Sequence, residues 1–204
     1  MSKRSKPEPK PDVLEAAFGL IADAGWRGYS ATALAERTGA SLDEIYAELP
    51  VPAALACRLG ARADRAMLAV SRDELAGLSP RERLFELLMR RLDALAPFKP
   101  GLVRLSAEAR GEPGLALATL ASLDRMAGWL LDLAGLPNHG LRARLGRRAL
   151  MLAYARLFRV WLRDDTPDQA TTLAELDKRL DQLERLARFG NRLRGGFGPR
   201  PQPA

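Results

Sequence analysis

Few residues of this chain could carry covalent or acid–base chemistry. Its 204 residues include one histidine, His139, and one cysteine, Cys57. His139 has no second metal ligand near it in the sequence, so we interpret it as a surface residue, and we interpret Cys57 as a small buried residue. Asp164 and Asp165 are adjacent acids before Thr-Pro, where they are better placed to cap the next helix than to bind a metal. With neither a phosphate loop nor a nucleophile elbow in the sequence, we predict no enzyme, no cofactor and no metal.

The more informative residues lie between Gly25 and Leu55, and they would make non-covalent contacts. Ser30 can cap a short helix through its hydroxyl, and Gly39 can end that helix in the left-handed conformation. Ser41, with Glu44 three residues later, forms a capping box that opens a second helix. Two short helices joined by a tight glycine turn predict a helix-turn-helix.

The composition predicts that helices alone position this motif. Leu, Ala, Arg and Glu dominate, β-branched residues are scarce, and prolines separate the apolar runs. We predict an all-α fold of about nine helices, with an N-terminal three-helix domain and a C-terminal helical bundle. In the second short helix Leu42, Ile45 and Tyr46 should form one apolar face. Later helices are expected at about 52–75, 80–96 and 101–110. After a Gly-Pro break at 111–114, a further helix should end at about 134, and two more are expected at 141–163 and from about 169.

The net charge of +7 is distributed unevenly. Residues 1–10 carry +3 and residues 11–50 carry −5, so the helix-turn-helix is itself acidic. From Arg185 onward the chain has five arginines and no acid. The basic N-terminal tail is either a solvated, disordered segment or an arm that contacts phosphates beside the helix-turn-helix.

The N-terminal third resembles the DNA-binding domain of the TetR family of bacterial repressors. In that family a glycine and an aromatic residue end helix 1, a Ser or Thr opens helix 2, and a Gly-x-Ser turn leads to a recognition helix packed by a Leu/Ile-Tyr pair. The matching residues here are Gly25, Trp26, Ser30, Leu34, Ala35, Gly39, Ser41, Ile45, Tyr46 and Leu55. Two positions depart from the pattern at helix 4: Leu49 replaces the aromatic residue and Pro52 replaces the phosphate-binding lysine.

The resemblance implies a cytoplasmic homodimeric transcriptional regulator that binds operator DNA and a small apolar effector. The residues expected to bind DNA are Tyr29, Ser30, Ser41, Leu42, Asp43, Tyr46 and Ala47. The residues expected to line an effector pocket are Phe85, Met89, Met126, Trp129, Tyr154 and Phe158. The two last long helices would form the dimer interface, through Leu157, Trp161, Leu173, Leu176, Leu180 and Leu183.

A second resemblance leaves an alternative function open. The stretch from Tyr154 to Leu180 is similar to the C-terminal domain of the lipid-binding accessory protein of ubiquinone biosynthesis, which has a TetR-like fold without DNA-binding function. The segment from Arg185 to Phe197 could then be an interfacial element, although Gly190, Gly195 and Gly196 favour a disordered basic tail. The alternative is a lipid- or isoprenoid-binding protein with a degenerate helix-turn-helix.

These observations divide the chain into four predicted segments. Residues 1–10 form a basic tail, 11–55 the helix-turn-helix domain, 56–189 a helical domain for ligand binding and dimerisation, and 190–204 a second basic tail. No apolar run is long enough for a transmembrane segment, and the N-terminus lacks the apolar stretch of a signal peptide.

Overall fold

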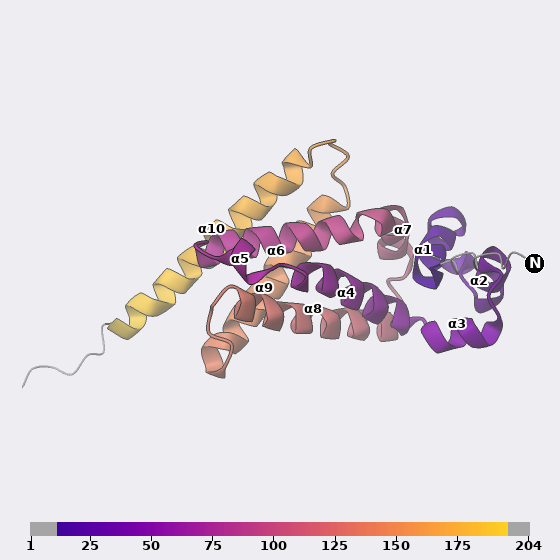
Figure 1. Ribbon diagram of the computed structural model, residues 1–204, viewed down its shortest axis with the longest axis horizontal. Coiled ribbons are helices and arrows are strands. Elements are labelled where there is room, and N and C mark those ends of the chain that lie inside the picture. Colours follow the sequence, from indigo (N-terminus) through magenta and orange to yellow (C-terminus); the bar gives the residue numbers. More distant parts are fainter. Residues whose placement is uncertain (1–11, 196–204) are drawn as a thin grey trace, which may run out of the picture. The chain divides into compact units, whose positions relative to one another are not determined.

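The structure, a computed structural model, describes residues 12–195, and all of its regular elements there are helical (Figure 1). The prediction of an all-α fold is therefore confirmed for this part of the chain. The predicted tail at 1–10 and residues 196–204 lie outside the described residues. The helices are α1 (Val13–Ala24), η1 (Trp26–Gly28), α2 (Ala31–Thr38), α3 (Leu42–Glu48), α4 (Ala53–Leu68), α5 (Arg72–Leu75), α6 (Pro80–Leu95), η2 (Ala96–Phe98), α7 (Lys99–Glu108), α8 (Pro113–Leu133), α9 (Gly140–Trp161) and α10 (Ala170–Gly195).

The helices form two compact units that differ from the predicted domains. In the part of the chain that the structure describes, the first unit comprises residues 12–64 and 92–122, and the second comprises 65–91 and 123–195. The first unit, called the head below, therefore contains α7 and the first half of α8 in addition to the helix-turn-helix. The second unit, called the body, contains most of α6, the second half of α8, and α9 and α10.

The core of the head lies between α1, the helix-turn-helix and α7. Phe18, Ile21, Leu34 and Ile45 are buried, and the rings of Phe18 and Phe98 meet edge to face with centroids 5.4 Å apart. Buried aromatic pairs in this geometry add stability beyond their area. This packing ties α7 to α1, so the predicted boundary near residue 55 does not separate the head from the rest of the chain.

The body is organised around the packing of α9 against α10. The turn between them is closed by Asp164, whose carboxylate accepts hydrogen bonds from the hydroxyl groups of Thr166 and Thr172 at 2.5 and 2.6 Å. The backbone N–H groups of the same two threonines also donate to it, at 3.2 and 2.7 Å. The expected capping role of this acidic pair is thus carried by Asp164.

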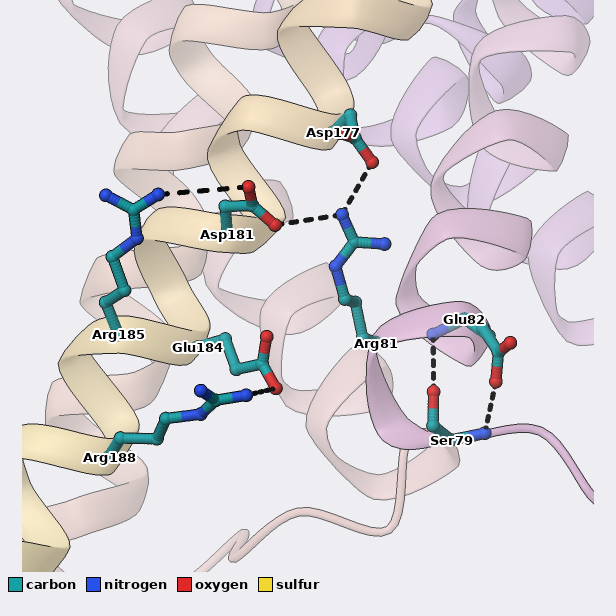
Figure 2. A network of polar contacts seen from close by, with 8 residues as sticks. All are labelled: Ser79, Arg81, Glu82, Asp177, Asp181, Glu184, Arg185 and Arg188. Atoms are coloured by element: carbon teal, nitrogen blue, oxygen red, sulfur yellow. Dashed lines mark hydrogen bonds and ion pairs between the residues drawn. The ribbon is translucent and has the colours of Figure 1, made fainter.

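Ion pairs connect α10 to the start of α6 (Figure 2). Arg81 donates from Nη2 to Asp177 and Asp181, at 2.5 and 3.0 Å. The start of α6 is fixed by the predicted capping of Ser79 with Glu82, in which Ser79 N–H donates to the glutamate at 2.7 Å. Hydrogen bonds with Ser79, first through its side chain and then through its backbone N–H, lower the pKa of Glu82 below its ordinary value.

Three local expectations need correction. The helix predicted at 52–75 ends at Leu68, and α5 begins after Ser71, which forms a capping box with Glu74. Cys57 is exposed on α4 and not buried. In the other direction, α10 continues to Gly195, inside the segment predicted as a C-terminal tail. Within residues 12–195, no helix has the length and apolar character to cross a membrane.

Candidate nucleic-acid interface

The geometry of the helix-turn-helix follows from its predicted caps. The hydroxyl of Ser30 accepts a hydrogen bond from Ala33 N–H at 3.1 Å at the start of α2. Gly39 ends α2 with φ of 69°, in the left-handed region. Ser41 and Glu44 form the capping box of α3, each accepting from the other's backbone N–H. Because each of these contacts is local, the sequence spacing sets where α2 ends and where α3 begins.

One face of α3 is buried and the other faces solvent. Ile45 is 1% exposed and Leu49 is 8% exposed, so they anchor α3 to the head. Leu42 and Tyr46, expected to share that apolar face, are instead 54% and 67% exposed. Their neighbours Asp43 and Ala47 are exposed as well. Four of the residues predicted to bind DNA therefore form one continuous outer face of α3, which we call the α3 face.

The other three predicted DNA contacts lie at the helix starts. Ser30 and Ser41 are exposed, but their hydroxyl groups already serve as caps. Tyr29 is half-buried, and its ring stacks on the indole of Trp26 with centroids 5.4 Å apart and planes 7° apart. Burial raises the pKa of the Tyr29 phenol above its ordinary value. The phenol is therefore neutral at physiological pH and can both donate and accept a hydrogen bond.

Most arginines near the α3 face are already paired with acids. Arg37 contacts Asp23 at 2.7 Å. Arg58 contacts the carboxylate of Glu48 at 3.2 Å and donates to the last carbonyl groups of α3, where a cation is favoured by the helix dipole. Because these guanidinium groups are paired within the head, they are less available to bind phosphates.

The sequence analysis did not single out Arg27, which the structure marks as a contact candidate. It is exposed in η1, two residues before Tyr29, and within the described residues it has no ion pair. The sequence narrows the choice to two arginines in residues 11–50, and the structure excludes Arg37 because it is paired with Asp23. Val51 was also missed; it is 55% exposed and lies three residues after Glu48, where α3 ends.

A cavity of about 520 Å³ lies on another side of the helix-turn-helix. It is bordered by the start of α1, the turn between α2 and α3, and the residues Glu44, Ala47 and Glu48 of α3. None of its lining residues is basic. At its edge Asp12 caps α1 and pairs with Arg62 of α4. Burial opposes ionisation of Asp12, but the amide of Glu15 and the guanidinium of Arg62 outweigh it, so the pKa of Asp12 lies below its ordinary value.

The residues predicted to line an effector pocket all lie in the body, but their exposure differs. Met126 and Tyr154 are buried, whereas Trp129 is 44% exposed. Phe85, Met89 and Phe158 are half-buried. On α9 the rings of Tyr154, Phe158 and Trp161 stack in series, with centroids 5.8 and 5.4 Å apart.

The residues predicted to form the dimer interface are largely buried within one chain. Leu157 and Trp161 on α9, and Leu176 and Leu180 on α10, are at most 2% exposed. Leu173 and Leu183 are half-buried. The large apolar residues that α9 does expose are different ones, namely Leu141, Leu145 and Leu152, at 72%, 59% and 69%.

Solved structures of transcriptional regulators share this architecture. The TetR transcriptional regulator from Nitrosomonas europaea ATCC 19718 is 24% identical, with a TM-score of 0.70 over 87% of this chain and 99% of its own. A transcriptional regulator from Rhodococcus sp. Rha1 is 18% identical, with a TM-score of 0.59 over 87% of this chain and 97% of its own. A structure assigned to the TetR family, from Mesorhizobium loti MAFF303099, is 17% identical, with a TM-score of 0.51 over 85% and 94% of the two chains.

These likenesses define the class of fold. The chain has the TetR fold, in which a helix-turn-helix head is joined to an all-helical body. No protein-family model matches the sequence, and the search of curated proteins finds no match either.

Proposed function

We propose that the protein is a homodimeric transcriptional regulator that inserts α3 into the major groove of operator DNA. The observation that carries this proposal is the α3 face: a helix opened by a capping box, whose outer residues include a 67% exposed tyrosine that the core does not need. Leu42 and Tyr46 lie one turn apart and are both exposed, and a cluster of exposed apolar side chains marks an interaction site in a way that a single one does not. The names of the similar structures support a regulatory role.

The chemistry of the α3 face favours base contacts over phosphate contacts. Leu42 and Ala47 can contact the methyl group of thymine, and the carboxylate of Asp43 can accept from cytosine N4. Phosphate contacts would come from Arg27 and from the N–H groups at the start of α2. With so few cations available, non-specific affinity should be weak and the dependence on salt shallow.

Fluorescence anisotropy with DNA from upstream of the protein's own gene tests this proposal. We expect saturable binding at low ionic strength that Tyr46→Ala weakens by roughly tenfold or more, and that Arg27→Gln weakens similarly on all sequences. The matched control is Leu117→Ala, which removes an equally exposed apolar side chain, at 67%, from α8. If wild-type protein shows no saturable binding, or if all three variants bind alike, the α3 face is not a DNA interface.

We further propose that the dimer forms through the exposed face of α9. Leu141, Leu145 and Leu152 recur at helical spacing on the side opposite the buried Tyr154 and Leu157. Removing three exposed leucines from water supplies the apolar centre that a stable interface needs. The proposed interface uses Leu141, Leu145 and Leu152, which the sequence analysis did not name for it.

The charges of α9 indicate which surface of the second copy it meets. Residues 140–161 include six arginines and no acid, so two copies of α9 in direct contact would repel each other. The first part of α10 has the opposite balance, because residues 170–184 include four acids and two basic residues. Among these acids, Asp177 is exposed, although its carboxylate already contacts Arg81 of α6 in the same chain. An isologous interface can place α9 of each copy against α10 of the other. Each of these two contacts then joins a basic helix to a helix segment with excess acids.

Sedimentation equilibrium of two leucine variants tests this interface. We expect Leu152→Glu to shift the chain to the monomer, whereas Leu117→Glu, similarly exposed on α8, leaves the dimer intact. Loss of the dimer should also weaken DNA binding, because two half-sites are then no longer held together. A wild-type monomer, or a Leu152→Glu dimer of unchanged strength, would rule the α9 face out.

The body is proposed to bind a small apolar effector near the stacked rings of α9. An effector shifts the protein away from its DNA-binding state only through its differential affinity for the two states. A thermal-shift screen of apolar compounds on wild type and Phe158→Ala identifies such a ligand by stabilisation that the variant loses. Stabilisation that is identical in both proteins would place the ligand elsewhere.

The alternative function, a lipid- or isoprenoid-binding protein, rests on the acidic head, on Pro52 in place of a lysine, and on the resemblance of the stretch from Tyr154 to Leu180 to the lipid-binding accessory protein. In the structure most arginines of the head form ion pairs with acids. Ion pairing alone therefore explains why the head should attract phosphates weakly, and a loss of DNA-binding function is not needed to explain it. The names of the similar structures are those of transcriptional regulators. We therefore prefer the regulatory function.

A further inference from the structure

We propose that Glu108 and Glu112 are positioning residues for the DNA interface, which hold Trp26 and, through it, Tyr29 in place. The contacts lie entirely within the head, between the α7 region and the segment that joins α1 to α2. The part of this proposal that concerns DNA rests on the proposed function. The part that concerns the position of Tyr29 does not.

Glu108 connects α7 to the backbone of the helix-turn-helix. One carboxylate oxygen accepts a hydrogen bond from Trp26 N–H at 2.8 Å, and the other accepts from Arg104 Nε at 3.0 Å. Gly25 leaves room for this pair, since a Cβ at that position would lie 2.6 Å from the carboxylate and φ there is +76°. A carboxylate held by its own helix thus fixes the first backbone group of η1.

Glu112 binds the side chain of Trp26, whereas Glu108 binds its backbone. Its carboxylate accepts a hydrogen bond from the indole Nε1–H of Trp26 at 3.3 Å. With its backbone N–H and its ring N–H both bound, the indole of Trp26 has one orientation. The Tyr29 ring stacks on that indole almost in parallel, so its position is fixed in turn.

Tyr29 is the last residue before Ser30, the cap of α2, so its position and the start of α2 are set together. Both glutamates are exposed and lie more than 80 residues away along the chain. Apolar contacts already join α1 to η2 and the start of α7, as Phe18 and Phe98 show. The two carboxylates additionally constrain the orientation of Trp26, because a hydrogen bond depends on angle and an apolar contact does not.

Alanine and glutamine variants of the two glutamates test this proposal, with Asp93→Ala as the control. Asp93 is an exposed acid of the head, and its carboxylate is not one of the two that bind Trp26. The first readout is the ultraviolet titration of the Tyr29 phenol, identified by difference from Tyr29→Phe. We expect Glu108→Ala with Glu112→Ala to bring its raised pKa back toward the ordinary value of about 10.

The second readout is operator affinity, which the double alanine variant should lower on the order of tenfold. Glu108→Gln, which keeps an acceptor for Trp26 N–H, should retain most of the affinity, and Asp93→Ala should match wild type. An unchanged Tyr29 titration in the double variant would overturn the proposal. So would a loss of affinity that glutamine fails to rescue. If wild type binds no DNA, the proposed function fails, and the titration alone still decides whether the glutamates position Tyr29.

Discussion

Gly101 of α7 lies directly against the backbone carbonyl of Phe18 of α1. A Cβ built on Gly101 would be 2.3 Å from the Phe18 oxygen, a distance that real contacts do not reach. The absence of a side chain at this one position lets α7 pack closely against α1. We predict that Gly101→Ala lowers the free energy of unfolding by roughly 1–3 kcal/mol, because the two helices must separate. Urea denaturation measures the change.

The control for this substitution is Gly111→Ala. Nothing lies within 4 Å of the corresponding Cβ position, and no positive φ is required there. Its effect should stay within about 0.5 kcal/mol of zero. Equal losses at positions 101 and 111 would contradict the close packing of α1 and α7.

Gly39 offers a different test, because its requirement is conformational and not steric. Its φ is +69°, yet a Cβ there would meet nothing within 4 Å. We predict that Gly39→Ala destabilises the protein by about 1 kcal/mol and that Gly39→Asn costs less, since asparagine tolerates the left-handed region. Thermal unfolding followed by circular dichroism distinguishes the two variants. The same loss in both would mean that the left-handed turn is not what the glycine provides.

The caps of the helix-turn-helix should be measurable one at a time. Ser41→Ala removes a hydroxyl that accepts from Glu44 N–H at 3.2 Å, and we expect a loss of about 1 kcal/mol in urea denaturation. Ser41→Asp, which can still cap, should lose much less. If both substitutions are neutral, the angle between α2 and α3 does not depend on this cap.

Acid should destabilise the turn between α9 and α10. Hydrogen bonds to the Asp164 carboxylate, first from Thr166 and then from Thr172, place its pKa well below its ordinary value of 3.8. Because the unfolded chain then binds the proton more readily, this stabilisation is complete above the unfolded pKa and is lost as the pH falls below it. We predict that the free energy of unfolding falls below about pH 4. Asp164→Asn, which cannot ionise, should lose less stability over that range, and an identical pH profile in both proteins would refute this assignment.

The ion pairs of Arg81 with α10 should contribute little and should be sensitive to salt. Both pairs are partly exposed, so we predict that Arg81→Ala costs no more than about 1 kcal/mol at low salt and less in about 1 M salt. Arg185→Ala is the control, because Arg185 is 80% exposed and lies 4.0 Å from Asp181. A salt-independent loss in Arg81→Ala would indicate a packing role for its side chain instead.

The parts of the fold that local residues determine could be predicted from the sequence. Ser30, Gly39 and Ser41 act on backbone groups no more than four residues away, so their spacing was sufficient to place α2 and α3. The break after α4 carries the same kind of signal, since Ser71 and Glu74 repeat the spacing of Ser41 and Glu44.

The contacts between distant segments could not be predicted in this way. Periodic leucines indicate that a helix face is buried but not which surface covers it. Leu176 and Leu180 are therefore covered within their own chain, although the sequence equally allowed a second copy. The hydrogen bonds of Glu108 and Glu112 to Trp26 join residues more than 80 positions apart, and no local pattern marks them.

The discontinuous make-up of the head limits how it can be transplanted. A chimeric regulator that borrowed only residues 12–64 would leave Phe18 without the ring of Phe98 and Trp26 without its two glutamates. The DNA specificity proposed for the head would therefore not be transferred by one continuous segment. A functional graft would have to carry two separate stretches of the gene.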